Sequence, residues 1–240
     1  MIKVITFDLD DTLWDARPVL FEAERAVYEW LTVTCPAAAA RHSPASLRNL
    51  HSRLAAEQPE LTHQITASRR MTLQFVLQQA GVPLDHAGTT ADEGIAVFLE
   101  ARHQVELYAV VEPMLAKLAD NFILGALTNG NADVHRLEIG RYFTFAFSAE
   151  MLNSSKPQSA HFEHTEHITG AAAAQILHVG DHIEHDVQPA HQRGWRTIWV
   201  RRDSSMSQQA PPGTAVIDDV NDLPATVQRL TQLPLPRSND

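Results

Sequence analysis

The pattern of apolar and polar residues divides the chain into two kinds of region. Short apolar runs typical of β-strands occur at 3–9, 122–128, 143–148, 175–180, 196–201 and 215–219. From residue 112 onward these runs alternate with segments of helical periodicity, including 133–140. Such alternation predicts an α/β fold with a doubly wound parallel sheet, whose strands are covered by helices on both faces. A surface loop is expected at 203–213 and a disordered tail at 234–240.

A helical pattern precedes this alternation. Leu20, Ala23 and Val27 are separated by three and four residues, as residues on one face of a helix are. Ser43 and Pro44 are the residue types that favour the N-cap and the first position of a second helix. Because no run in this part of the chain has the character of a strand, the region is predicted to be all-helical.

The helical region predicts the domain organisation. Two further helices are expected at 73–80 and 89–105, the first closed by a glycine. We therefore predict an all-helical cap domain over 16–111. It interrupts an α/β core domain that is formed by residues 1–15 and 112–240.

Composition and charge limit the classes of partner. The 240 residues include 29 acidic and 19 basic side chains, for a formal net charge of -10. This charge argues against nucleic acid or an anionic membrane as the main partner and leaves a small molecule. The single cysteine, Cys35, allows neither an intramolecular disulfide nor a cysteine-based zinc site. No apolar stretch approaches the roughly 20 residues that span a bilayer, so we expect a cytoplasmic protein, monomeric or homodimeric.

Polar residues that could carry chemistry follow successive strands of the predicted sheet. In an open parallel sheet, ligands bind beyond the carboxyl ends of the strands. The loops there should bring together the polar residues that follow the first, second, third and fourth strands: Asp8, Asp10 and Asp11; Thr128 and Asn129; Lys156; Asp181 and Asp186. Each group has an ordinary alternative role as a turn residue, a helix cap or a solvated charge. Their order along one sheet favours a joint site.

The motifs "DLDDT", "LTN", the lysine of "SKP" and "GDHIEHD" together resemble those of the haloacid dehalogenase-like (HAD) hydrolase superfamily. The resemblance extends over the whole chain and implies a Rossmann-like core with an inserted helical cap. It also implies Mg²⁺ bound by the Asp8 side chain, the Asp10 backbone carbonyl and Asp181, with Asp186 supporting directly or through water. An all-oxygen ligand set of this kind suits Mg²⁺.

The residue types suit phosphoryl transfer. Asp8 can act as the nucleophile and form an aspartyl-phosphate, while Asp10 protonates the leaving oxygen and later activates water. Lys156 can balance the charge of Asp8 and of the phosphate. Thr128 and Asn129 are expected to hold the phosphate oxygens. The predicted activity is Mg²⁺-dependent hydrolysis of a small-molecule phosphate monoester.

Three other functions are alternatives to a phosphatase. A 2-haloacid dehalogenase of the same superfamily displaces halide, which needs no proton, and by resemblance lacks an acid at the position of Asp10. A phosphomutase keeps both aspartates, and no sequence feature demands it. A non-catalytic protein that binds a phosphorylated metabolite would be expected to have lost Asp8 or Lys156, and this chain retains both.

Substrate choice is expected to depend on the cap and on residues just after the first motif, with Arg69 or Arg70 as further candidates. "FDLDDTLWDARPVL" resembles bacterial phosphatases that act on flavin mononucleotide or phosphoribitylamino-uracil. Trp14 could then stack on a flat ring and Arg17 could bind a polar group. Alternatively, Trp14 packs the cap against the core and Arg17 starts a helix. His161, His164 and His167, spaced by three, are expected on a solvated helix face, and His182 is a candidate contact to phosphate.

Overall fold

The computed structural model describes residues 1–202 and 208–233. The chain divides into two compact units: a core unit of Met1–Asp15 with Glu106–Asp240, and a cap unit of Ala16–Val105. The sequence placed the second boundary later, between residues 111 and 112. The predicted tail at 234–240 and the first part of the loop predicted at 203–213 lie outside the described residues.

The core unit contains a six-stranded parallel sheet, which confirms the predicted fold class. Its order is β3-β2-β1-β4-β5-β6. The strands are β1 Val4–Phe7, β2 Ile123–Thr128, β3 Phe145–Ser148, β4 Ile176–Gly180, β5 Arg196–Val200 and β6 Ala215–Ile217. Strand β1 lies between β2 and β4, and all its residues are buried. The first motif therefore leaves the centre of the sheet.

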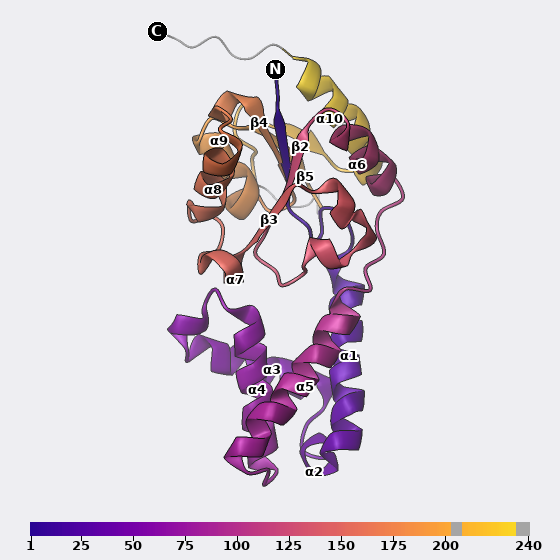
Figure 1. Cartoon of the computed structure of the whole chain (residues 1–240), viewed down its shortest axis with the longest axis vertical. Helices are drawn as coiled ribbons and strands as arrows, with labels where there is room; N and C mark the ends of the chain where they lie inside the picture. The colour runs from indigo at the N-terminus through magenta and orange to yellow at the C-terminus, as the bar shows by residue number, and fades with distance from the viewer. Residues whose placement is uncertain (203–207, 234–240) are drawn as a thin grey trace. The chain divides into compact units, whose positions relative to one another are not determined.

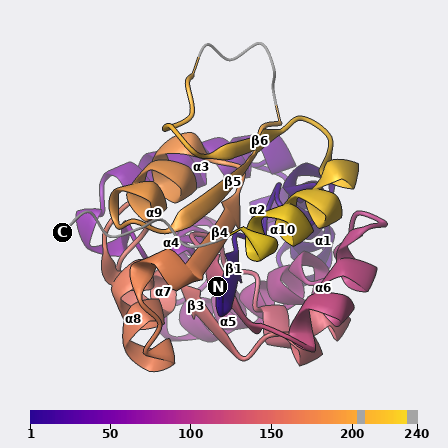
Figure 2. The ribbon, with the colours of Figure 1, turned by 90° about the horizontal axis from the view of Figure 1, so that it is seen from above.

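Helices cover both faces of this sheet. Figures 1 and 2 show α6 (Val111–Ala119) and α10 (Leu223–Gln232) on one face, with α8 (Ala160–Thr169) and α9 (Gln188–Gln192) on the other. A short α7 (Ala149–Leu152) follows β3. The prediction of a helix at 133–140 is wrong. This segment forms two 3₁₀ turns, because Leu137 between them has an extended backbone.

The cap unit is all-helical in its described residues, as predicted. Its helices are α1 Ala16–Thr34, α2 Pro36–Ala39, α3 Pro44–Ala56, α4 Ile65–Gln79 and α5 Leu84–Arg102. The expected cap of α3 is confirmed, since the Ser43 hydroxyl accepts from the Ser46 amide at 3.2 Å. Gly81, at φ 93°, follows α4 as expected. Helix α5 starts before the segment predicted for it. Apolar residues of α1, α4 and α5 form the core of this unit, which also includes Cys35.

Among the described residues, no helix combines the length and apolar character needed to cross a membrane.

Candidate active site

The first carboxylate of the site follows β1 directly. The parallel ladder continues one residue beyond the strand, because the Asp8 amide donates to the Val179 carbonyl at 2.8 Å. Asp8 is thereby fixed at the carboxyl edge of the sheet with only 7% of its surface exposed. The chain then turns, with the Leu13 amide donating to the Leu9 carbonyl and Asp11 in the left-handed region at φ 58°. Aspartate is among the residues that tolerate this conformation, so Asp11 serves the turn.

An indole holds the carboxylate of Asp10. Trp14 Nε1 donates to Asp10 Oδ1 at 2.9 Å, and the Trp14 side chain is fully buried. A buried indole N–H needs an acceptor, so this bond fixes the orientation of the Asp10 carboxyl group. The second expected specificity residue, Arg17, lies exposed in the first turn of α1. Roles for Trp14 and Arg17 in substrate choice stay predictions.

Lys156 is the buried cation of the site. Its ammonium group donates to Asp8 Oδ1 at 2.7 Å, to Asp186 Oδ1 at 2.5 Å and to the Leu127 carbonyl at 2.6 Å. These three acceptors match the three donors of an ammonium group. The structure thus brings together the lysine after β3 and the carboxylates after β1 and β4.

Thr128, the last residue of β2, and Asn129, which follows it, have different environments. The Asn129 side chain makes two hydrogen bonds with the backbone of Lys156. Its Nδ2 donates to the Lys156 carbonyl at 2.9 Å, and its Oδ1 accepts from the Lys156 amide at 2.7 Å. In the structure Asn129 therefore positions the lysine, and its expected contact to phosphate stays a prediction. The buried Thr128 hydroxyl accepts from the Gly130 amide at 2.9 Å, which leaves its proton for an oxyanion.

The last two carboxylates follow β4. Asp181 Oδ1 accepts from the Thr12 hydroxyl at 3.4 Å. The chain then forms a π-helical turn, Ile183–Val187, which returns Asp186 to the sheet. Gly180 permits this approach, because a Cβ there would lie 2.5 Å from the Asp186 Cβ. Both Asp186 oxygens accept hydrogen bonds, Oδ1 from Lys156 and Oδ2 from the His182 amide at 3.1 Å.

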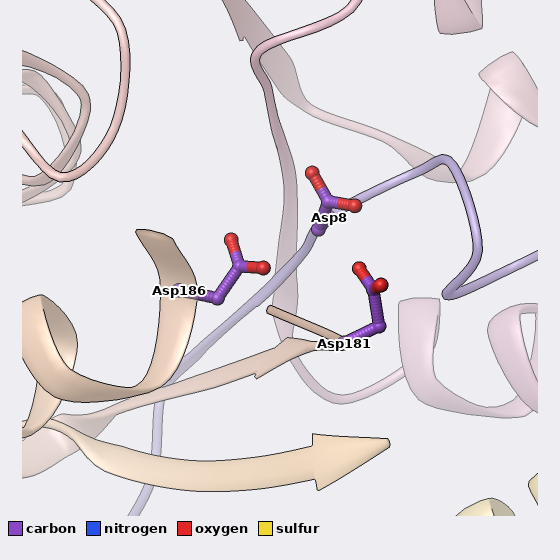
Figure 3. A group of neighbouring side chains, drawn as sticks. All are labelled: Asp8, Asp181 and Asp186. Atoms are coloured by element: carbon purple, nitrogen blue, oxygen red, sulfur yellow. The ribbon is translucent and has the colours of Figure 1, made fainter. Parts of the chain in front are cut away.

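Three carboxylates converge at the site around this one lysine. Asp8, Asp181 and Asp186 each offer an oxygen within 4.8 Å of the others, and their carboxyl groups point toward a common space in Figure 3. The ligand atoms that these three residues offer are all carboxylate oxygens, which fits a hard divalent cation. Asp186 already uses both oxygens, so Asp8 and Asp181 are the better placed direct ligands.

Burial and like charge set the protonation of this cluster. Burial, with added repulsion from Asp186 and Asp11, raises the pKa of Asp181 to about 7. Burial and the other two acids raise the pKa of Asp8, an effect that Lys156 opposes. Burial would lower the pKa of Lys156, but Asp186 and Asp8 raise it above its ordinary value. Full ionisation of the three acids would therefore place more negative charge here than one lysine balances, as expected of a cation site.

Two buried residues of the site were missed from the sequence. The Thr6 hydroxyl lies 2.8 Å from His178 Nδ1, and His178 Nε2 lies 3.3 Å from Asp186 Oδ1. Thr6 and His178 face each other in the register of β1 and β4. The available signal was a polar residue inside each of two otherwise apolar strands. His178 thus ties Asp186 to the centre of the sheet.

His161, His164 and His182 have different environments. The expectation of a solvated face is wrong for His161, which is fully buried, with Nε2 3.2 Å from the Thr128 carbonyl. Its helix, α8, turns this residue and Phe162 inward and leaves His164 exposed. His182 Nδ1 accepts from two amides of the π-helical turn, and its ring stacks on His185 at 3.9 Å. A contact between His182 and phosphate stays a prediction.

Comparison with known proteins places this geometry in a family. The model of the haloacid dehalogenase-like hydrolases matches residues 2–194. The 5-amino-6-(5-phospho-D-ribitylamino)uracil phosphatase YigB of Escherichia coli K12 is 30% identical over 203 residues, 85% of each chain. A glyceraldehyde 3-phosphate phosphatase of Methanopyrus kandleri is 24% identical over 84% of this chain and 85% of its own.

A solved structure agrees with these sequence matches. The 2-haloacid dehalogenase of Pseudomonas syringae pv. Tomato DC3000 superimposes with a TM-score of 0.87 at 41% identity, over 95% of this chain and 99% of the other. The family model covers most of the sequence and includes the strands that carry the four motifs. The chain belongs to the haloacid dehalogenase-like hydrolase family.

Proposed function

We propose that this chain hydrolyses a small-molecule phosphate monoester through an aspartyl-phosphate on Asp8, with Mg²⁺ as cofactor. The observation that carries the proposal is the contact between the buried Lys156 ammonium group and Asp8, with Asp10 oriented two residues later. The relatives that are named as phosphatases support the same reaction class, phosphoric monoester hydrolysis.

The first half-reaction forms an ester of Asp8. An Asp8 oxygen attacks phosphorus, the bond from phosphorus to the leaving oxygen breaks, and Asp10 gives its proton to that oxygen. Lys156 favours the ionised, nucleophilic form of Asp8 by its charge and hydrogen bond. The Thr128 hydroxyl can donate to a non-transferring phosphate oxygen.

The second half-reaction releases phosphate. Water attacks phosphorus, the Asp10 carboxylate takes the proton of that water, and the bond between Asp8 and phosphorus breaks. Asp10 returns to its acid form and Asp8 to its carboxylate. Because Trp14 holds Asp10 by one oxygen in both steps, the same carboxyl group can serve as acid and then as base.

The carboxylate cluster fits Mg²⁺. Asp8 and Asp181, with the Asp10 backbone carbonyl that the first motif implies, would hold the ion. Asp186 would act through water because its oxygens are engaged by Lys156 and His182. When bound, Mg²⁺ would offset the negative charge of the cluster and of the phosphate oxygens. Burial, and next the charges of Asp186 and Asp11, raise the pKa of Asp181, which agrees with a buried ligand beside other acids.

Dehalogenation is the second candidate, because a structural relative at 41% identity is named as a 2-haloacid dehalogenase. Asp10 favours the phosphatase, since departure of a halide needs no acid. A single turnover in ¹⁸O-labelled water separates the two reactions. Attack on phosphorus puts the label in released phosphate, whereas hydrolysis of a carbon ester of Asp8 puts it in the Asp8 carboxylate.

The substrate class is tested by comparing kcat/KM between phosphate esters. We propose a flavin-pathway phosphate, either flavin mononucleotide or the phosphoribitylamino-uracil named for the Escherichia coli relative. Purified protein with Mg²⁺ should release phosphate from one of these with a higher kcat/KM than from glyceraldehyde 3-phosphate. Asp8→Asn should abolish turnover of each. Release of chloride from 2-chloropropionate without release of phosphate from any ester would reject the phosphatase assignment.

A further inference from the structure

The cap unit contains a cavity of about 50 Å³ that the core chemistry does not use. Helices α1, α3, α4 and α5 all contribute to its wall, so it is a partly open cavity between these helices. Most of the lining is apolar and includes Leu47, Leu73 and Phe98. Three charged side chains also line it, Glu24, Arg48 and Arg69.

Two guanidinium groups share the one carboxylate of this cavity. Arg48 takes the better contacts to Glu24, with its Nε 2.7 Å and its Nη2 2.5 Å from Glu24 Oε2. Arg69 Nη1 lies 3.7 Å from Glu24 Oε1, beyond ordinary hydrogen-bond distance. The charge of Arg69 is therefore the less well compensated of the two.

Arg69 is also the more deeply placed arginine. Its side chain is 17% exposed, against 48% for Arg48. Its guanidinium carbon lies 4.4 Å from the centre of the Phe98 ring, and its Nε is buried without a hydrogen-bond partner. A buried donor left without an acceptor destabilises the fold, because the group has lost its hydration. An anion in the cavity would supply the missing acceptor.

The other polar groups of the cavity are already engaged. The Thr72 hydroxyl donates to the Ser68 carbonyl at 3.0 Å, and His51 Nε2 pairs with the Ser68 hydroxyl at 3.2 Å. Burial, and next the charge of Arg69, lower the pKa of His51 to about 4, so this ring is neutral at pH 7. A phosphate ion needs donors around four oxygens, and this wall offers few. A planar carboxylate matches the fork of one guanidinium.

We propose that the cap cavity binds a short-chain carboxylate, with its carboxylate group on Arg69 and its carbon chain against Leu47, Leu73 and Phe98. A volume of about 50 Å³ has room for roughly four water-sized groups, which limits the ligand to about two to four carbons. The ligand would bridge helices that are distant in sequence and so stabilise the cap unit. This site is distinct from the carboxylate cluster of the core unit.

Equilibrium dialysis of the full chain against ¹⁴C-propionate tests the proposal without any measurement of turnover. We expect saturable binding of one propionate per chain, and a rise in Tm of roughly 3–6 °C at a tenfold excess over Kd. Arg69→Met keeps the side-chain stem over Phe98 but removes the charge, and should weaken binding at least tenfold. The matched control is Arg53→Met, an exposed arginine of α3, which should bind as the wild type does.

Filling the cavity gives an independent variant. Leu47→Phe should also lose propionate binding while it keeps Arg69. The proposal is overturned if propionate does not bind at 50 mM, or if Arg69→Met binds it as tightly as the wild type. It is also overturned if chloride or inorganic phosphate displaces propionate at equal concentration. Because the readout is binding, none of these results bears on phosphatase activity.

Discussion

Lys156 Nζ and Asp8 Oδ1 lie 2.7 Å apart, and both residues are almost completely buried. Two charges in such a place are stable only as a pair with further hydrogen bonds, which Asp186 and the Leu127 carbonyl supply to the lysine. The lysine thus has two consequences, one for the reaction and one for stability. It favours the ionised, nucleophilic form of Asp8 against the effect of burial, and it pairs with two acids of the cluster.

Lys156→Met should remove both effects. Three acids would remain without their buried cation, and breaking a buried pair costs about 3–5 kcal/mol. We expect a clear fall in the urea midpoint at pH 7.5, together with loss of nearly all phosphatase activity. The control is Lys117→Met, at an exposed lysine of α6, which should change neither property. A Lys156→Met protein with the stability and activity of the wild type would contradict the assigned role.

The pKa of Asp181 predicts how Mg²⁺ binding depends on pH. Without metal this pKa is raised to about 7 from its ordinary 3.8, first by burial and then by Asp186 and Asp11. Folding of the metal-free protein therefore takes up a proton between these values, and the resulting stabilisation is lost as pH rises toward 7. A cation must displace this proton below pH 7. Stabilisation by Mg²⁺ should consequently be larger at pH 8 than at pH 5.5.

The measurement is the difference in Tm between samples with Mg²⁺ and with EDTA at each pH. The protein also loses stability as pH falls because buried histidines with lowered pKa values, such as His161 and His51, favour the neutral form in the folded state. They act equally in both samples, so the difference removes them. Asp181→Asn should show little stabilisation by Mg²⁺ at either pH. Equal stabilisation of the wild type by Mg²⁺ at both pH values would show that Asp181 does not bind the metal.

The sequence predicted the convergence of the candidate catalytic residues because parallel topology determines it. Once the strands are recognised, Asp8, Thr128, Lys156 and Asp181 must all follow carboxyl ends at one edge of the sheet. Their order along the chain was then sufficient to recognise the family. The six strands were predicted for a similar reason, since each is a mainly apolar run between polar turns.

The interactions that support these residues could not be predicted in the same way. In a central parallel strand both faces are buried, so periodicity does not distinguish His178 from its apolar neighbours. To predict its contact with Thr6, one also needs to know the order of the strands and their register. The contact of Asn129 with the Lys156 backbone depends on the conformation of the loop after α7. The bond from Trp14 to Asp10 depends on a turn that includes a left-handed Asp11.

The contact between His178 and Asp186 predicts that substitution of His178 affects the metal site. His178→Leu removes the hydrogen bond to Asp186 Oδ1 and leaves this acid freer to move. Groups that orient ligands in this way are typically worth about 10–100-fold in metal affinity or activity. We expect the Mg²⁺ concentration for half-maximal activity to rise by this order. His178→Gln, which can keep a donor toward Asp186, should recover part of the loss. Equal effects of both variants would indicate a packing role alone.

The last prediction concerns the bond between Trp14 and Asp10. Asp10→Asn removes the acid, so alkyl phosphates, whose alkoxides leave poorly without a proton, should slow by roughly 10²–10⁴-fold. An aryl phosphate with a good leaving group should slow much less in its first step. Trp14→Phe keeps an aromatic ring in the buried site but removes the N–H that orients Asp10, and should reproduce this preference to a smaller degree.

The control for the indole is Trp195→Phe, a buried tryptophan whose Nε1 donates to Glu166 at 2.8 Å. This variant loses a comparable bond to a carboxylate away from the reaction, so its kcat/KM ratio for alkyl and aryl esters should equal that of the wild type. Single-turnover rates of both esters, measured with the Tm of each variant, give the comparison. If Trp14→Phe lowers Tm as Trp195→Phe does and leaves the alkyl-to-aryl ratio unchanged, then Trp14 only packs, and Asp10 is oriented by other contacts.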